Sequence, residues 1–324
     1  MASIELLEKL EEHDKSVCYQ YQRRLDTIEE DKQKYGWTDE DISQIRLEDF
    51  VFENITSDED KRECKEFIER YEWLGCLGWY NTHYFTARYI GDKKPSGTSE
   101  RGLLGGVIVM GMPNAFSKML GDETRSLERL VNRGASASWT PKNLGTMFLN
   151  WCCKWMVHNT PYRLFTAYSD PSAGELGTIY MASNWWLISK KGGAATMCIN
   201  PYDETKIISD RRFRARSFYT RYAKELGIPW GDNWKNDTRM CWENIPDDIE
   251  EKLREYAKKK YAEAKKIKVP AKLKWAFVLG KDKRETKELR EKFKRLNKIY
   301  ENPDSSERGK FDLSIKSLMN EENN

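Results

Sequence analysis

The spacing of apolar residues in the first 72 positions predicts helices separated by an irregular segment. Residues 3–35 carry an apolar stripe at helical spacing, and residues 58–72 repeat this pattern. Four apolar side chains of the second segment share one face: Cys64, Phe67, Ile68 and Tyr71. Asp58 is in position to cap that helix. Residues 36–60 are acidic and show no clear period, so we expect a loop-rich connection there.

From residue 73 onwards the pattern becomes that of a sheet. Segment 79–90 is rich in β-branched and aromatic residues. A turn rich in Gly, Pro and Ser follows, and the apolar run LLGGVIVMGM then completes a predicted hairpin. Further strands are predicted at 126–133, 162–168, 185–191 and 272–279. Helices are predicted from Thr146 to Val157, over 174–184 and in the charged segment after residue 280.

This alternation of strands and helices predicts an α/β fold with a mixed sheet flanked by helices. Residues 205–268 interrupt it with basic, aromatic-rich segments that we expect to be helical. We therefore divide the chain into an acidic helical extension, a core in two pieces, a basic helical insertion and a disordered tail. Their bounds are 1–60, 61–204 with 269–296, 205–268 and 305–324, respectively.

Charge is distributed unevenly along the chain, although the net charge is only +3. Residues 1–72 contain 11 Lys and Arg against 22 Asp and Glu, whereas residues 205–300 contain 28 against 15. Such a basic C-terminal third is typical of a surface that meets a polyanion, although solvated helix faces give the same count.

The cysteines and histidines predict neither disulfides nor a metal site. Seven Cys occur without a Cys-x-x-Cys pair, and only three His are present. We expect reduced thiols, a core position for Cys152 and Cys153, and no bound metal. The acidic start and the absence of a long apolar run indicate a protein of the cytoplasm, without a signal peptide or membrane span.

Segment 162–186, YRLFTAYSDPSAGELGTIYMASNWW, resembles the central motif of the phage Mom-type DNA-modification proteins. Those proteins have an Ala-Tyr/Phe-Ser/Ala-Asp run at a strand end, a Gly-Thr-Ile-Tyr helix and then Asn-Trp/Phe. The segments LLGGVIVMGMPN, SLERLVNR and KLKWAFVLGKDKRE resemble flanking strands of the family. The resemblance implies a GCN5-related N-acyltransferase (GNAT)-like fold that acts on a base of DNA.

The resemblance departs from the family pattern at one pair of residues. The family has a His-Tyr pair shortly after the helix that corresponds to 62–70, where this chain reads Tyr71-Glu72-Trp73. A His-Tyr pair occurs later, at His83 and Tyr84, in a predicted strand. We interpret that later pair as half-buried structural residues.

Acyl transfer to an amine needs a proton acceptor, a proton donor and groups that hold the carbonyl. Asp170 ends a predicted strand, where an open α/β sheet exposes side chains to its ligand crevice. With the resemblance, we assign Asp170 as base or orienting residue and Tyr180 as acid, and we place Ser169 in the same catalytic group. The alternatives are a turn residue for Asp170 and a core aromatic for Tyr180.

The acyl donor is expected at the turn before the predicted helix of 146–157. Backbone N–H groups at a helix start bind phosphate, which points to Lys142, Asn143, Gly145 and Thr146 as donor-binding residues. The usual Gln/Arg-x-x-Gly-x-Gly/Ala pattern of coenzyme A binding is absent. An acyl-coenzyme A and an aminoacyl-tRNA therefore both remain open as donors, as does an ordinary helix cap.

Nucleic acid is expected to contact the basic segment that follows residue 210. Arg211, Arg212, Arg214 and Arg216 alternate there with aromatic residues, among them Phe213, Phe218, Tyr219 and Tyr222. Arginines can contact phosphates while aromatic rings stack on a displaced base. Trp73 is assigned to the same group of contacts. A basic amphipathic helix with buried rings is the alternative.

Together these features predict an enzyme that transfers an acyl or aminoacyl-derived group to a base amine, with double-stranded DNA or a flipped base as its substrate. Its product would protect phage DNA from restriction in the cytoplasm of the infected bacterium. Two alternatives stay open: an acyltransferase that acts on RNA or protein, and a non-catalytic nucleic-acid-binding protein on the same fold.

Overall fold

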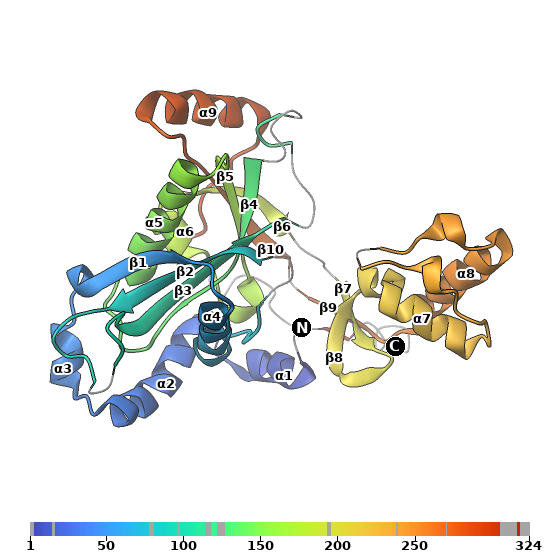
Figure 1. Cartoon of the computed structure of the whole chain (residues 1–324), viewed down its shortest axis with the longest axis horizontal. Helices are drawn as coiled ribbons and strands as arrows, with labels where there is room; N and C mark the ends of the chain where they lie inside the picture. The colour runs from blue at the N-terminus through green and yellow to red at the C-terminus, as the bar shows by residue number, and fades with distance from the viewer. Residues whose placement is uncertain are drawn as a thin grey trace. The chain divides into compact units, whose positions relative to one another are not determined.

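The computed structural model divides the chain into two compact units (Figure 1). Unit 1 comprises Met1–Glu12, Ala194–Pro270 and Leu313–Asn324, and unit 2 comprises His13–Gly193 and Ala271–Asp312. The structure describes residues 3–14, 17–77, 81–95, 98–113, 118–121, 127–192, 196–237, 239–269, 271–304 and 316–317. Apart from 316–317, the predicted disordered tail lies outside these residues.

Unit 2 is built on a seven-stranded mixed sheet with the order β1-β2-β3-β4-β5-β10-β6. Its strands are β1 (Phe50–Ile55), β2 (Asn81–Tyr89), β3 (Leu103–Gly111), β4 (Glu128–Ser136), β5 (Leu164–Ser169), β6 (Trp186–Gly192) and β10 (Lys272–Val278). Neighbouring strands are antiparallel except β4 and β5, which are parallel. The predicted α/β class with a mixed sheet flanked by helices is therefore confirmed.

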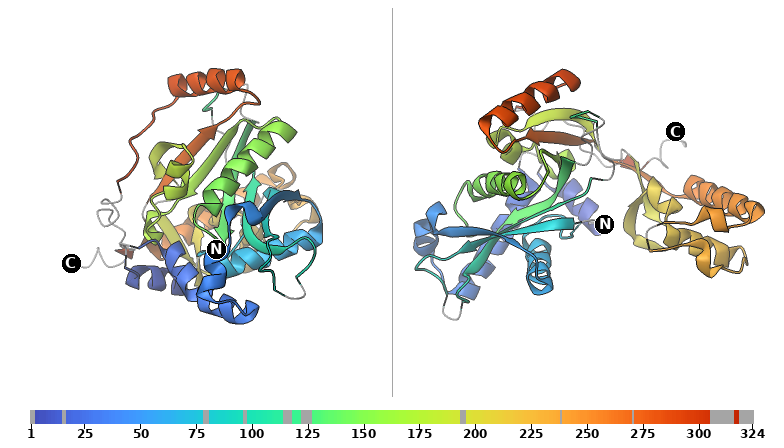
Figure 2. Two further views of the ribbon diagram at one scale, coloured as in Figure 1. Left: turned by 90° about the vertical axis from the view of Figure 1, so that its left-hand side faces the viewer. Right: turned by 45° about the horizontal axis from the view of Figure 1, so that its top comes forward.

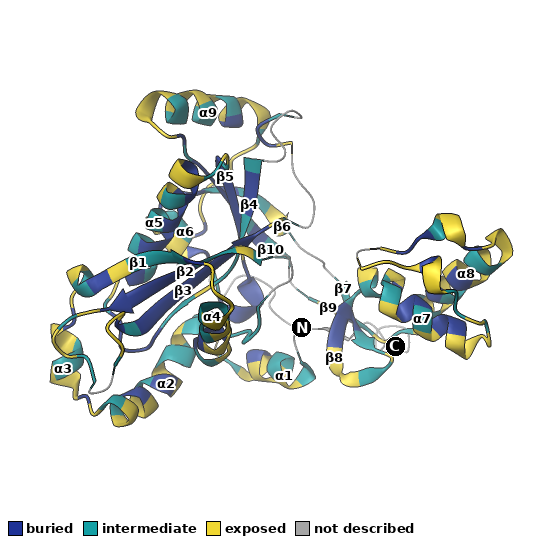
Figure 3. Cartoon of the chain, viewed as in Figure 1, coloured by how far each residue is buried: buried dark blue, intermediate teal, exposed yellow. Residues whose placement is uncertain are grey.

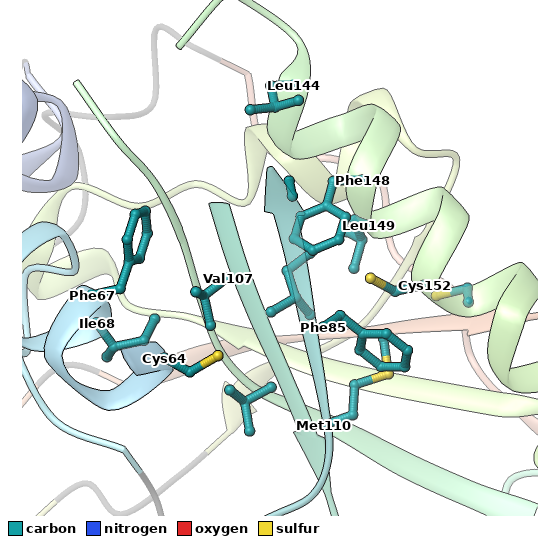
Figure 4. Packing of buried hydrophobic residues seen from close by; sticks show 14 of the residues in the cluster. Cys64, Phe67, Ile68, Phe85, Val107, Met110, Leu144, Phe148, Leu149 and Cys152 are labelled. Atoms are coloured by element: carbon teal, nitrogen blue, oxygen red, sulfur yellow. The ribbon is translucent and has the colours of Figure 1, made fainter. Parts of the chain in front are cut away.

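Helices cover both faces of this sheet (Figures 1 and 2). The helices of unit 2 are α2 (Tyr19–Tyr35), α3 (Asp39–Gln44), α4 (Asp58–Tyr71), α5 (Leu144–Asn159), α6 (Thr178–Ala182) and α9 (Lys283–Leu296), with short 3-10 turns at Leu47–Asp49 and Pro171–Ala173. In Figure 4, Cys64 and Ile68 of α4 face Val107 of β3, whereas Phe148 and Cys152 of α5 lie on the other side of the strands. These side chains are almost completely buried and form the core of unit 2.

The N-terminal part differs from the prediction in three places. The helix expected over 3–35 is interrupted, giving α1 (Ile4–Glu12) and α2. The side chain of Ser57, not Asp58, caps α4 by accepting from the backbone N–H of Asp60. Residues 36–60 contain α3 and the edge strand β1, because FVFENI pairs along its whole length with β2. The short segment β1 therefore forms a strand because it pairs with β2, although the sequence around it is acidic.

Unit 1 contains a second sheet that the sequence did not predict. Its strand order is β11-β9-β7-β8. Its elements are α1, β7 (Thr196–Asn200), β8 (Asp203–Ser209), a 3-10 turn at Asp210–Arg214, α7 (Arg216–Glu225), α8 (Asp247–Glu263), β9 (Lys266–Lys268) and β11 (Lys316–Ser317), with short 3-10 turns at Asp232–Trp234 and Trp242–Asn244. The basic segment 205–268 is thus not entirely helical, since it includes most of β8 and all of β9.

The structure also shows the state of the cysteines and the burial of the central strands. All seven cysteines are free thiols, and Cys152 and Cys153 are fully buried in α5 as predicted. Among the described residues, no helix combines the length and the apolar character needed to cross a bilayer. Figure 3 shows the contrast between the buried central strands and the more exposed outer helices.

Candidate active site

The sheet of unit 2 opens at the C-terminal ends of its two parallel strands. β4 and β5 pair only from Glu128↔Leu164 to Leu130↔Thr166. Beyond that point β4 continues along β3 as far as Ser136, and β5 continues along β10 as far as Ser169. Ligands of open α/β sheets bind beyond the carboxyl ends of parallel strands, so this divergence marks the candidate site.

Ser169 and Asp170 lie at this opening and are both engaged. The hydroxyl of Ser169 accepts a hydrogen bond from the Trp275 indole at 2.9 Å. One carboxylate oxygen of Asp170 accepts from the backbone N–H and the hydroxyl of Ser172, at 3.0 and 2.5 Å. Its other oxygen forms an ion pair with Lys272 at 2.7 Å. Because both carboxylate oxygens of Asp170 are engaged, an orienting role fits Asp170 better than the role of a proton acceptor.

Glu175 is a carboxylate at this site that the sequence did not reveal. Its Oε1 accepts from the indole N–H of Trp73, and its Oε2 accepts from the backbone N–H of Asp170, each at 2.9 Å. Burial raises the pKa of Glu175 to about 7, and the negative charges of Asp170 and Glu72 act in the same direction. A carboxylate with a pKa near neutrality can accept a proton at physiological pH.

A second buried carboxylate, Glu72, follows α4 and lies near the first. Its Oε2 accepts from the backbone N–H groups of Leu74 and Gly75, each at 2.9 Å. Its Oε1 is 3.9 Å from Nε of Arg133, which comes from the diverging part of β4. Burial raises the pKa of Glu72 above its ordinary value. The turn after α4 thus brings Glu72 and Trp73 to the opening together.

Tyr180 lies in α6, close to the same carboxylates. Its ring centroid is 5.1 Å from that of Trp185 and 5.8 Å from that of Trp275. Burial raises the pKa of its hydroxyl, and the charge of Glu175 raises it further. Gly177 permits this packing, because it has a φ of +80° and a Cβ there would lie 2.4 Å from Trp275.

The predicted catalytic pair is therefore linked through a third residue. Glu175 accepts a hydrogen bond from Asp170 and is an electrostatic neighbour of Tyr180. Asp170 and Tyr180 make no hydrogen bond to each other among the described contacts. Trp73, predicted to contact nucleic acid, joins this group through Glu175. The roles assigned to Ser169, Asp170 and Tyr180 remain predictions.

The predicted donor turn stands at the start of α5, beside α6. Asn143 precedes the helix with a φ of 69°, and Lys142 and Asn143 are exposed. Gly145 and Thr146 are half-buried in the first turn, and a Cβ on Gly145 would lie 3.2 Å from Ile179, the neighbour of Tyr180. The predicted donor turn and α6 are thus adjacent, and the donor-binding role of the turn stays a prediction.

The arginines of the basic segment belong to unit 1. Arg211 and Arg214 are exposed, and Arg214 forms an ion pair with Asp210 at 3.2 Å. The guanidinium of Arg212 lies 5.7 Å from the centroid of the Phe218 ring. Arg216 donates to the backbone carbonyl of Asn236. These positions leave the proposed phosphate contacts untested.

The aromatic residues that alternate with these arginines do not form a stacking surface. The buried core of unit 1 contains four of them: Phe213, Phe218, Tyr219 and Tyr222. Each is at most 3% exposed, so none of these rings can stack on a displaced base. That part of the prediction is wrong, because unit 1 has a small core of its own that these rings must fill.

The His-Tyr pair of β2 lies outside the group around Glu175. His83 and Tyr84 are both half-buried, as predicted. The His83 ring lies 5.9 Å from Tyr162 and 6.3 Å from Trp155, and burial lowers its pKa. Within the described ranges, no three His, Cys, Asp or Glu side chains are grouped so that they could hold a metal ion.

Comparison with known proteins identifies one family. The model of the Mom protein family matches residues 60–296, which is most of the chain. Among solved structures, the ribosomal-protein-S5-alanine acetyltransferase from Vibrio fischeri is similar at 11% identity and a TM-score of 0.32. That match covers 50% of this chain and 91% of the other. No curated protein matches the chain.

Proposed function

The chain belongs to the Mom protein family, and from this premise we propose that it is a phage acyltransferase that modifies DNA. It transfers an acyl or aminoacyl-derived group to an amine of a DNA base, and the modified bases protect phage DNA from host restriction. The observation that supports this most directly is the half-buried Glu175, with a pKa of about 7, beside Tyr180 at the opening between β4 and β5.

In the proposed reaction the exocyclic amine of the base attacks the carbonyl carbon of the donor. A C–N bond forms, the bond between the acyl carbon and the donor's leaving atom breaks, and the amine proton passes to the Glu175 carboxylate. Tyr180, whose raised pKa keeps it protonated, donates a proton to the leaving atom. Asp170, held by Lys272 and Ser172, fixes the backbone N–H that hydrogen-bonds Glu175.

The donor is assigned to the start of α5. Helix N-termini attract phosphate through unpaired backbone N–H groups and the helix dipole. Lys142, Asn143, Gly145 and Thr146 surround that start, next to α6. An acyl-coenzyme A or an aminoacyl-tRNA supplies an acyl group beside a phosphate, and both fit this assignment.

The nucleic-acid contacts proposed for this reaction fall into two groups. Trp73 stands at the catalytic opening, where its indole donates to Glu175 and its ring is half-exposed. Arg211, Arg212, Arg214 and Arg216 belong to unit 1 and contribute contacts to phosphates. Contacts to the DNA phosphates carry no sequence information. We therefore assign selection of the base to the opening between β4 and β5.

Restriction digestion tests the proposed function without knowledge of the donor. Plasmid DNA is purified from cells that express the parent chain, the Glu175→Gln variant or a Glu59→Gln control on the exposed face of α4. We expect the parent and the control to yield DNA that resists a panel of restriction endonucleases, and Glu175→Gln to yield DNA that is cut. Complete cutting of the DNA from the parent would contradict DNA modification. Acylated RNA or protein in those cells would then indicate the alternative substrates.

A further inference from the structure

A groove with basic walls lies at the end of unit 2 remote from the candidate active site. It has a volume of about 670 Å³ and lies between the last turns of α5 and helix α9. Six of its lining residues are Lys or Arg, and only Asp282 and Glu291 are acidic. Asp282 is already engaged, because its carboxylate accepts from the backbone N–H of Glu285 and caps α9. The groove therefore carries a net positive charge.

Four of the seven cations of α9 form a regular stripe. Lys283, Lys287, Arg290 and Lys294 are spaced by four, three and four residues, which places them on one side of a helix. At 1.5 Å per residue the stripe extends over about 16 Å. Phe293 of α9 is buried against the sheet, and Arg290 is half-buried and donates to the backbone carbonyl of Val278 at 3.0 Å. The three lysines of the stripe are exposed. Lys154 and His158 of α5 face the stripe across the groove.

The shape of this charge fits a polymer of phosphates better than a small anion. Duplex DNA carries roughly one negative charge per 1.7 Å of its axis, so a 16 Å stripe runs beside about nine charges. A free phosphate or a coenzyme could neutralise only part of the stripe. Lys154, Lys283 and Lys287 are exposed and make no ion pair among the described side chains. They are therefore available to phosphates.

The groove and the opening near Glu175 lie at opposite ends of β5. Val278 pairs with Leu164 at the start of β5 and leads into the groove at Leu279. Asp170 follows the other end of β5, six residues further on. At about 3.3 Å per residue the two sites are roughly 20 Å apart along the strand. That separation corresponds to about six base pairs of duplex at about 3.4 Å each.

We infer that the groove between α5 and α9 binds the phosphate backbone of duplex DNA and anchors the duplex whose base enters the opening near Glu175. This inference rests on the proposed function for its choice of polyanion. It places a docking surface for DNA on unit 2, in addition to the contacts proposed for the arginines of unit 1. Figures 1 and 2 show α9 across the end of the sheet, and Figure 3 shows its largely exposed surface.

Direct binding to a fluorescein-labelled duplex tests the inference on the full chain. The Lys154→Gln/Lys287→Gln variant removes one exposed cation from each wall. We expect the slope of log Kd against log salt to become less steep by about 1.8, at roughly 0.9 for each lost contact. The matched control, Lys34→Gln/Lys65→Gln, removes two exposed cations of unit 2 outside the groove and should leave the slope unchanged.

Three results would overturn the inference. They are an unchanged slope in the groove variant, an equal loss in the control, and a loss that appears only with tRNA as the labelled ligand. Base modification is scored separately by nucleoside analysis. If the groove variant loses duplex binding while even the parent leaves bases unmodified, the proposed function fails and the groove stands. If bases are modified but the slopes agree, the groove fails and the function stands.

Discussion

At the scale of single residues, Glu175 is the group to which we assign the most specific chemical role. Two hydrogen bonds, from Trp73 and from the backbone of Asp170, hold its carboxylate, while burial raises its pKa to about 7. Hydrogen bonds from N–H groups keep the charged form accessible, and burial keeps the protonated form accessible. The side chain can therefore change protonation state near neutral pH.

The raised pKa predicts how stability depends on pH. A carboxyl group whose pKa rises on folding from 4.5 to about 7 favours the folded state in its protonated form. That contribution is present below pH 4.5 and is lost as the pH rises through about 7. We expect the Tm of the parent to fall, relative to Glu175→Gln, between about pH 5 and pH 8. Parallel Tm curves for the two proteins would contradict the assigned pKa.

Glu175 also shows what sequence reading could not find. Its hydrogen-bond partner Trp73 lies 102 residues away along the chain. A single Glu beside a short helix has no motif of its own, and its pKa depends on burial that only tertiary structure provides. Asp170 and Tyr180 were assigned because they stand in the Ser-Asp and Gly-Thr-Ile-Tyr runs that match the family motif, whereas Glu175 lies in the same segment between those runs.

At the scale of elements, α2 supports the turn that leads into α5, where we propose that the donor binds. Arg24 donates to the backbone carbonyls of Ser138 and Thr140, at 3.0 and 2.9 Å. Asp31 is fully buried and accepts from the hydroxyls of Tyr71 and Ser138, at 2.9 and 2.5 Å. This helix precedes the segment matched by the family model, so the N-terminal region stabilises the core from outside that segment.

Substitution of Asp31 tests this support. Asp31→Asn keeps the shape of the side chain but removes the negative charge that pairs with Arg70 at 2.8 Å. We expect the free energy of unfolding to fall by about 2 kcal/mol, as is usual when a buried polar network loses a charged acceptor. Asp26→Asn on the exposed face of α2 serves as the control in urea unfolding. Equal midpoints for the two variants would show that α2 does not support the core.

Some strands could be predicted from the sequence and others could not. β2, β3 and β5 were predicted to within a few residues, because their apolar and β-branched runs are bounded by turns. β1 and the short strands of unit 1 were missed. β1 is a half-exposed edge strand, and β9 has only three residues, so neither carries a strong pattern.

At the scale of the whole molecule, the largest segment of unit 1, Ala194–Pro270, is inserted between β6 and β10 of unit 2. Gly192 at the end of β6 pairs with Lys272 at the start of β10. The chain thus leaves and re-enters unit 2 at neighbouring positions, as a hairpin would. Insertions at such adjacent ends leave the host core intact. The division into domains drawn from the sequence stays a prediction in its detailed bounds.

Removal of the inserted segment tests the independence of unit 2. Residues 194–270 are replaced by a short glycine-containing turn that joins β6 to β10. We expect the sheet of unit 2 to remain folded, with a cooperative urea transition, because the core of unit 2 includes no residue from 194–270. Loss of cooperative unfolding in this variant, while the intact chain unfolds cooperatively, would show that the two units fold as one.

The most direct test of the account is mass spectrometry of nucleosides from the DNA of cells that express the protein. If the opening around Glu175 and Tyr180 transfers an acyl-derived group to a base, the parent should yield one nucleoside of increased mass. Glu175→Gln and Tyr180→Phe should lower its amount by roughly 10²–10⁴-fold, the range typical of one acid or base group. The account is contradicted if the parent yields only ordinary nucleosides, or if both folded variants yield the modified nucleoside in the same amount as the parent.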